Sequence, residues 1–132
     1  MFILYLIILG YLLFVRGFDF EVSNYISYNL RFFATIKRYV FLLNSGNLYE
    51  FFINIIGNII VFMPLGFFIP QINRKLDKTV MMIFLSLMIP VVIEAAQYVL
   101  KVGILDVDDV LLNFIGIMAG FLIYRGVTHE KQ

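Results

Sequence analysis

Apolar residues fill most of this chain in long runs, and polar residues gather in short stretches between them. Such runs predict membrane-spanning helices, because a helix needs about 20 apolar residues to cross a bilayer and satisfies its own backbone hydrogen bonds there. We expect spans near residues 1–15, 48–70, 79–100 and 106–124. The predicted fold is therefore all-α, a polytopic membrane helix bundle of about four transmembrane helices in one domain that covers residues 1–132.

The segment 16–47 interrupts this pattern with basic, acidic and aromatic residues. Aromatic rings favour the headgroup level of a bilayer, and Arg31, Lys37 and Arg38 are placed to reach anionic lipid. We interpret the segment as an interfacial helix or a re-entrant loop, with a solvated connection as the alternative. Residues 17–20 are expected to extend the short first span into the interface.

Composition narrows the class of protein. Hydrophobic residues make up 62% of the chain and charged residues 14%, which suits a membrane protein and not a soluble domain. The net charge is only +1, and the basic residues are scattered, so we expect no nucleic-acid partner. Cysteine is absent, which excludes disulfides and thiolate metal sites. We predict no cofactor and no metal, and we interpret His129 as a solvated residue of the polar tail.

The short hairpin 71–78 carries Arg74, Lys75 and Lys78. Basic residues in short loops favour the cytoplasmic side of a membrane. With four spans, this places both termini in the cytoplasm and makes the chain a multi-pass protein of the cell membrane.

Polar residues inside apolar helices mark functional sites, because they are costly unless they meet partners, water or a ligand. Seven such residues form the candidate binding set: Asn54, Asn58, Glu94, Gln97, Asp106, Asp109 and Asn113. Asn54, Glu94 and Asn113 are expected about 9 to 11 Å below the same membrane face, at a rise of about 1.5 Å per residue. We predict that the set, with Asp106 at its edge, lines one cleft that opens to the extracytoplasmic side.

The acids of this set allow several kinds of chemistry. Glu94 and Asp109 are the candidate catalytic residues, one as a general acid and the other as a base, or both as ligands of a cation or an amine. The alternative is a hydrogen-bonded network that only fixes helix packing. Asp106, Asp108 and Asp109 fit a cation site and fit the capping of the last helix equally well.

Small residues follow the polar stripe of the last span. Gly116 and Gly120 continue the face of Asp109 and Asn113, and Gly57 lies beside Asn58. Glycines at this spacing allow two helices to approach closely. The contact is expected either within the bundle or between copies in a homo-oligomer.

Taken together, these motifs resemble the VanZ-like family of small bacterial membrane proteins over residues 50–124. The matching residues are Asn54, Gly57–Asn58, Phe62, Pro64–Gly66, Glu94, Gln97, Asp106, Asp109, Asn113 and Gly116. Many members carry an arginine just before the aspartate motif, whereas this chain has Gly103, Ile104 and Leu105 there. The resemblance implies a plasma-membrane protein, and the name-giving member is linked to low-level resistance to teicoplanin, a lipid-bearing glycopeptide.

Three functions remain open at this point. The first is recognition of a membrane lipid or a lipid-linked envelope molecule, with Glu94, Gln97 and Asp109 as polar anchors and a contribution to glycopeptide or lipopeptide resistance. The second is an enzyme that acts on a lipid headgroup or an envelope precursor. The third is a structural or regulatory membrane subunit.

Overall fold

The computed structural model describes residues 1–15, 28–46 and 48–129 of the chain, and almost all of them are helical. The elements in chain order are α1 (Phe2–Gly10), the π-helix η1 (Tyr11–Val15), β1 (Tyr28–Asn29), α2 (Ala34–Asn44), α3 (Leu48–Phe51), the π-helix η3 (Phe52–Ile56), α4 (Gly57–Ile72), the 3₁₀-helix η4 (Arg74–Leu76), α5 (Thr79–Leu100), β2 (Leu105–Asp106) and α6 (Val107–His129). The predicted all-α class is confirmed.

Three helical stretches are long and apolar enough to cross a membrane: Leu48–Ile72, Thr79–Leu100 and Val107–Thr128. They agree with the spans predicted from the apolar runs, except that the last one continues past residue 124. The first predicted span is a shorter apolar helix, Phe2–Val15. Its predicted extension over residues 17–20 lies outside the described residues.

Helices α4 and α6 form the closest contact of the bundle. A Cβ atom added to Gly120 would lie 1.8 Å from the carbonyl oxygen of Met63, and one added to Gly66 would lie 1.8 Å from that of Ile117. Such distances admit only a hydrogen atom, so the glycines let the two backbones touch. The glycine stripe of the last span thus packs within the bundle. Gly57 differs from the prediction, since the described residues place only the carbonyl oxygen of Phe52, five positions earlier, within 4 Å of a Cβ added there.

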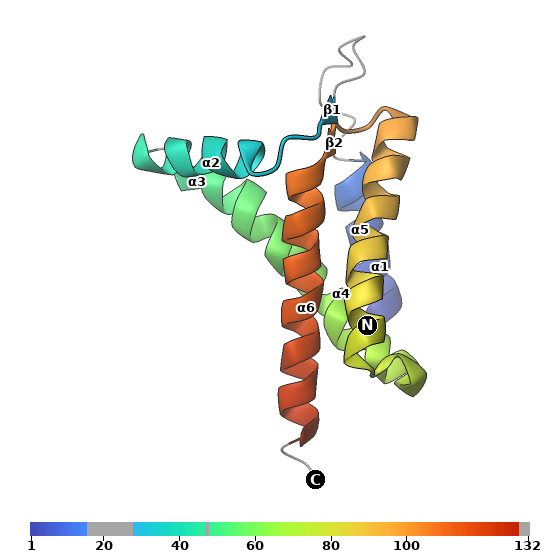
Figure 1. Ribbon diagram of the computed structural model, residues 1–132. Helices are drawn as coiled ribbons and strands as arrows, with labels where there is room; N and C mark the ends of the chain where they lie inside the picture. The colour runs from blue at the N-terminus through green and yellow to red at the C-terminus, as the bar shows by residue number, and fades with distance from the viewer. Residues whose placement is uncertain (16–27, 47, 130–132) are drawn as a thin grey trace.

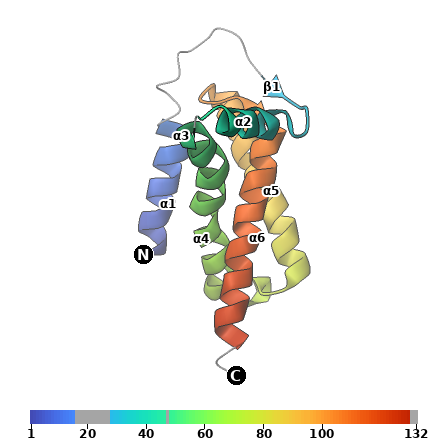
Figure 2. The same ribbon diagram turned by 90° about the vertical axis from the view of Figure 1, so that its left-hand side faces the viewer.

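The short helix α1 packs beside α4 (Figure 2). The hydroxyl of Tyr5 donates a hydrogen bond to the carbonyl oxygen of Val61, 2.8 Å away, and the rings of Phe2 and Phe68 lie 5.4 Å apart. Leu9 enters the buried core, whose other members come from α4, α5 and α6: Phe62, Leu65, Met82, Ile117, Phe121 and Tyr124.

Helix α2 runs crosswise to α6, at the end of the bundle where α5 ends and α6 begins (Figure 1). Lys37, Arg38 and Phe41 are exposed on it, while Tyr39 and Leu42 are half-buried. This helix is the longest element of the segment predicted to lie at the membrane surface, of which residues 28–46 are described. The start of α1 and the described end of α6 both lie away from α2 (Figure 2).

Candidate functional site

Asp106 links the end of α5 to the start of α6. Its Oδ1 atom accepts a hydrogen bond from the backbone N–H of Asp108 at 2.9 Å, which is the N-cap contact predicted for the last helix. Its own backbone N–H donates to Oε2 of Glu94 on α5 at 3.1 Å. Glu94 and Asp106 are both buried, with 4% and 7% of their surface exposed. The two predicted site residues therefore meet, and Glu94 holds the backbone of the turn.

Asp108 caps a different helix from its own. Its carboxylate accepts hydrogen bonds from the backbone N–H groups of Phe33, Thr35 and Ile36, at 2.6, 2.8 and 3.2 Å. Phe33 precedes α2 and makes no side-chain cap of its own, so Asp108 takes the place of an N-cap and its charge complements the helix dipole. Asp108 is fully buried under α2.

A second set of contacts holds the chain before α2. Tyr28 and Asn29 pair in parallel with Leu105 and Asp106. Oδ2 of Asp106 accepts a hydrogen bond from the Thr35 hydroxyl and a second, 3.3 Å long, from Nδ2 of Asn29. Residues 28–36 are thus fastened over the start of α6 by both backbone and side chains.

We call residues 28–44, which include α2 and cover the start of α6, the roof. Beneath this roof, Asn58 of α4 and Asp109 of α6 face each other. Nδ2 of Asn58 donates to Oδ1 of Asp109 at 3.1 Å. This is the only hydrogen bond of the Asp109 side chain among the described residues. One turn deeper on the same face lies Asn113, with 3% of its surface exposed. Its Oδ1 atom is buried and has no hydrogen-bond partner within the described chain. Two acceptors are thus incompletely satisfied between α4 and α6.

Asn54 and Gln97 turn away from this pair. Nδ2 of Asn54 donates to the backbone oxygen and to Oε2 of Glu50, at 2.9 and 3.1 Å. Nε2 of Gln97 donates to the carbonyl oxygen of Leu13 at 2.8 Å, and so ties α5 to the end of the first helix. The last carbonyl groups of a helix lack hydrogen-bond partners within the helix, which explains why the Gln97 side chain donates to one of them.

The family model for VanZ/LLP1 matches residues 2–128 of the chain. The chain belongs to the VanZ/LLP1 family. Comparisons with curated proteins and with solved structures gave no match. Family membership and three helices that are long and apolar enough to cross a bilayer make this VanZ/LLP1 chain a membrane protein.

The motif residues of this VanZ/LLP1 chain fall into two groups, according to whether their side chains hydrogen-bond to the backbone or to another side chain. Glu94, Asp106 and Asp108 accept hydrogen bonds from backbone N–H groups and so order the polypeptide. Within the described parts of the chain, the side chains of Asn58 and Asp109 hydrogen-bond only to each other. Among the described residues, no three acidic or histidine side chains are grouped so that they could hold a metal ion.

Tyr39 and Glu50 belong to the electrostatic surroundings of the VanZ/LLP1 site, and our sequence analysis missed them. Burial raises the pKa of Tyr39 above its usual value of 10.0. The remaining influences are smaller, lowering from Arg38 and raising from the carboxylates of Asp109, Glu50 and Asp106. Glu50 precedes Asn54 by one helical turn, and this spacing was the signal that could have revealed it.

Proposed function

We propose that this VanZ/LLP1 chain recognises a lipid or a lipid-linked envelope molecule between α4 and α6, under the roof of α2, and thereby contributes to protection against teicoplanin or lipopeptides. The observation that carries the proposal is the buried Oδ1 atom of Asn113, which has no partner among the described residues. A buried acceptor without a hydrogen bond costs about 1–3 kcal/mol, so the site favours a ligand that supplies a donor.

The chemistry of the site favours an ammonium or hydroxyl group on that ligand. Asp109 offers a carboxylate with one amide donor, and Asn113 offers an amide oxygen on the same face. Both accept hydrogen bonds, and an ionised acceptor binds a donor more strongly than a neutral one does. Lys37 and Arg38 on the exposed side of α2 would meet the phosphate of the same molecule.

These contacts change which residues we expect to bind the ligand. From the sequence we expected Glu94 and Gln97 to lie beside Asp109 at the ligand, but both already accept or donate hydrogen bonds to the backbone of neighbouring segments. We therefore assign the ligand-binding role to Asn58, Asp109 and Asn113, and a positioning role to Glu94.

A structural subunit is the second candidate function, because Asp106 and Asp108 are fully engaged in fastening α2. On this alternative the whole network only orders the helices. Substitution of Asp109 would then change the amount of folded protein and nothing else.

The experiment compares Asp109→Asn with wild type in a sensitive host. Protein in the membrane is quantified, and survival is measured against teicoplanin and an amphipathic lipopeptide. We expect equal abundance and lost protection for Asp109→Asn, and unchanged protection for the matched control Asp77→Asn, whose acid lies at the other end of the bundle. Full protection by Asp109→Asn, or none by wild type, contradicts the proposal.

We further propose that the chain is multi-pass, with both termini and the basic hairpin in the cytoplasm. The chain contains no cysteine, so single cysteines report their own side of the membrane. In intact cells, a membrane-impermeant maleimide is expected to label Lys37→Cys and to leave Lys75→Cys unlabelled until the cells are lysed. The reverse pattern would show the opposite orientation.

A further inference from the structure

A second polar region lies at the end of the bundle away from α2. A cavity of about 440 Å³ opens there, between the ends of α4 and α6. Six residues line it: Phe67, Gln71, Arg74, Tyr124, Val127 and Thr128. None of them belongs to the candidate site described above, so this cavity requires its own explanation.

The lining of the cavity is partly apolar and partly polar. Phe67 and Tyr124 place their rings edge to face, with centroids 6.2 Å apart, and Val127 adds an aliphatic surface. Arg74 lies just beyond the end of the span Leu48–Ile72, where headgroups of a bilayer begin. The side chain of Arg74 is thus placed at headgroup depth, beside a surface that suits hydrocarbon.

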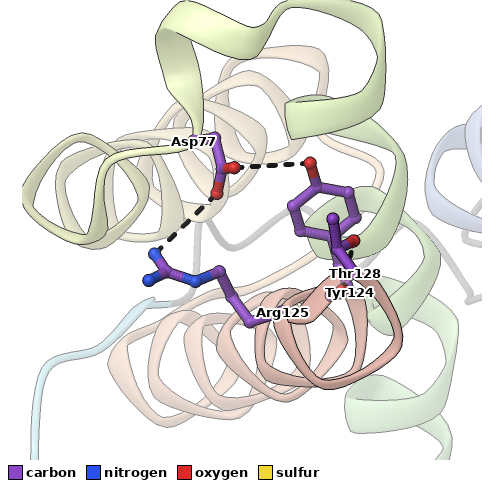
Figure 3. A network of polar contacts seen from close by, with 4 residues as sticks. All are labelled: Asp77, Tyr124, Arg125 and Thr128. Carbon is purple, nitrogen blue, oxygen red and sulfur yellow. Dashed lines mark hydrogen bonds and ion pairs between the residues drawn. The ribbon is translucent and has the colours of Figure 1, made fainter. Parts of the chain in front are cut away.

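Asp77, three residues after Arg74 in the chain, makes its contacts elsewhere. Figure 3 shows the carboxylate of Asp77 directed at Tyr124 and Arg125. Tyr124 donates its hydroxyl to Oδ2 of Asp77 at 3.4 Å, and Nη1 of Arg125 lies 3.8 Å from Oδ1. Arg74 makes no ion pair with any of the described residues. Its guanidinium is therefore available to an anion.

The charge of the surrounding surface also favours an anionic ligand. Asp77 is the only acid among the described residues of this end, which also carries four cations: Arg74, Lys75, Lys78 and Arg125. Basic residues just outside a span attract anionic lipid, by about 1 kcal/mol each. Arginine also presents a planar fork that matches a phosphate with two hydrogen bonds.

We infer that this cavity binds an anionic phospholipid, with its phosphate on Arg74 and an acyl chain against Phe67 and Val127. The site is separate from the one under α2 and does not depend on the function proposed there. It gives the end of the α4–α6 pair a lipid that fills the groove between the two helices.

Purified wild-type protein in detergent micelles is titrated with phosphatidylglycerol and, separately, with phosphatidylcholine of the same acyl chains, and bound lipid is counted by native mass spectrometry. We expect phosphatidylglycerol to bind about tenfold more tightly, and Arg74→Gln to remove about that factor. Lys75→Gln is the matched control, because it removes the same charge from the same short helix without touching the cavity.

A second variant tests the cavity by a different change, so that the test remains valid if Arg74→Gln does not fold. Val127→Trp fills the cavity, leaves every charge in place and is expected to lower lipid binding as much as Arg74→Gln does. Equal binding of the two lipids, or equal effects of Arg74→Gln and Lys75→Gln, overturns the inference. Displacement of the lipid by millimolar inorganic phosphate would also overturn it, since the site would then be one for free phosphate.

Discussion

The carboxylate of Asp108 on α6 accepts a hydrogen bond from the backbone N–H of Thr35 on α2, 2.8 Å away and 73 positions earlier in the chain. This contact crosses from a buried helix to one that lies across the end of the bundle (Figure 1). Together with the contacts of Asp106, it explains how a surface helix with no buried residue keeps a defined position. The roof over Asp109 and Asn113 therefore depends on two buried carboxylates, those of Asp106 and Asp108.

The first prediction concerns this carboxylate. Asp108→Asn replaces one acceptor oxygen by an NH₂ group, which would face the N–H of Phe33 in the place of Oδ1, or those of Thr35 and Ile36 in the place of Oδ2. We expect the free energy of unfolding to fall by about 2–4 kcal/mol, because charge-assisted hydrogen bonds are lost in a buried place. Chemical unfolding in detergent micelles measures the change, and hydrogen exchange of the three amides locates it.

The control is Asp109→Asn, which leaves the contacts of Asp108 in place. We expect it to keep slow exchange at the same three amides. Slow exchange in Asp108→Asn as well would show that the carboxylate does not hold α2.

The sequence was informative where a local rule applies. Long apolar runs predicted the three long apolar helices, and the spacing of Gly116 and Gly120 predicted a close helix contact, since only small residues admit one. The same kind of rule predicted that an acid caps α6, but it left Asp106 and Asp108 as alternatives. The hydrogen bond from the N–H of Asp108 to Oδ1 of Asp106 identifies Asp106 as the cap.

The hydrogen-bond partners of most of the other polar residues could not be predicted, because they lie far away along the chain. The partners of Asp108 are backbone N–H groups, which every residue except proline carries, so no residue type marks them. Asn54 lies in the π-helix η3, whose extra residue per turn changes the face that each side chain occupies. The spacing of four between Asn54 and Asn58 therefore did not bring these two amides to one partner.

The second prediction tests the α4–α6 contact. Gly120→Ala would place its Cβ atom 1.8 Å from the carbonyl oxygen of Met63, and the backbones must separate to relieve this. We expect a loss of about 1–3 kcal/mol in the free energy of unfolding, the usual cost of overpacking, or more.

Gly126→Ala is the matched control on the same helix, since an added Cβ atom meets nothing within 4 Å there. Because alanine favours a helix over glycine, we expect it to raise stability by about 0.5–1 kcal/mol. Both free energies come from the same unfolding assay. If the two substitutions had the same sign of effect, the glycine contact would not be the cause.

The third prediction uses Tyr39 as a reporter of the roof. Its pKa is raised above 10.0 in the folded protein, chiefly by burial, so folding favours the neutral phenol. The folded state then binds this proton more tightly than the unfolded state does. The resulting stabilisation is complete below the unfolded pKa and is lost as pH rises through the folded pKa.

Tyr39→Phe removes the titrating group and keeps the ring. We expect the free energy of unfolding of wild type to fall more steeply than that of Tyr39→Phe as the pH rises above 10.0. The single variant Asp108→Asn, which keeps Tyr39, should release α2, expose the phenol and return its pKa toward the ordinary value. The ultraviolet absorbance of the phenolate measures this titration, as the difference from the same protein with Tyr39→Phe. Parallel stability curves for wild type and Tyr39→Phe would mean that Tyr39 is not buried by the roof, and an unchanged titration in Asp108→Asn would separate Tyr39 from the anchor at Asp108.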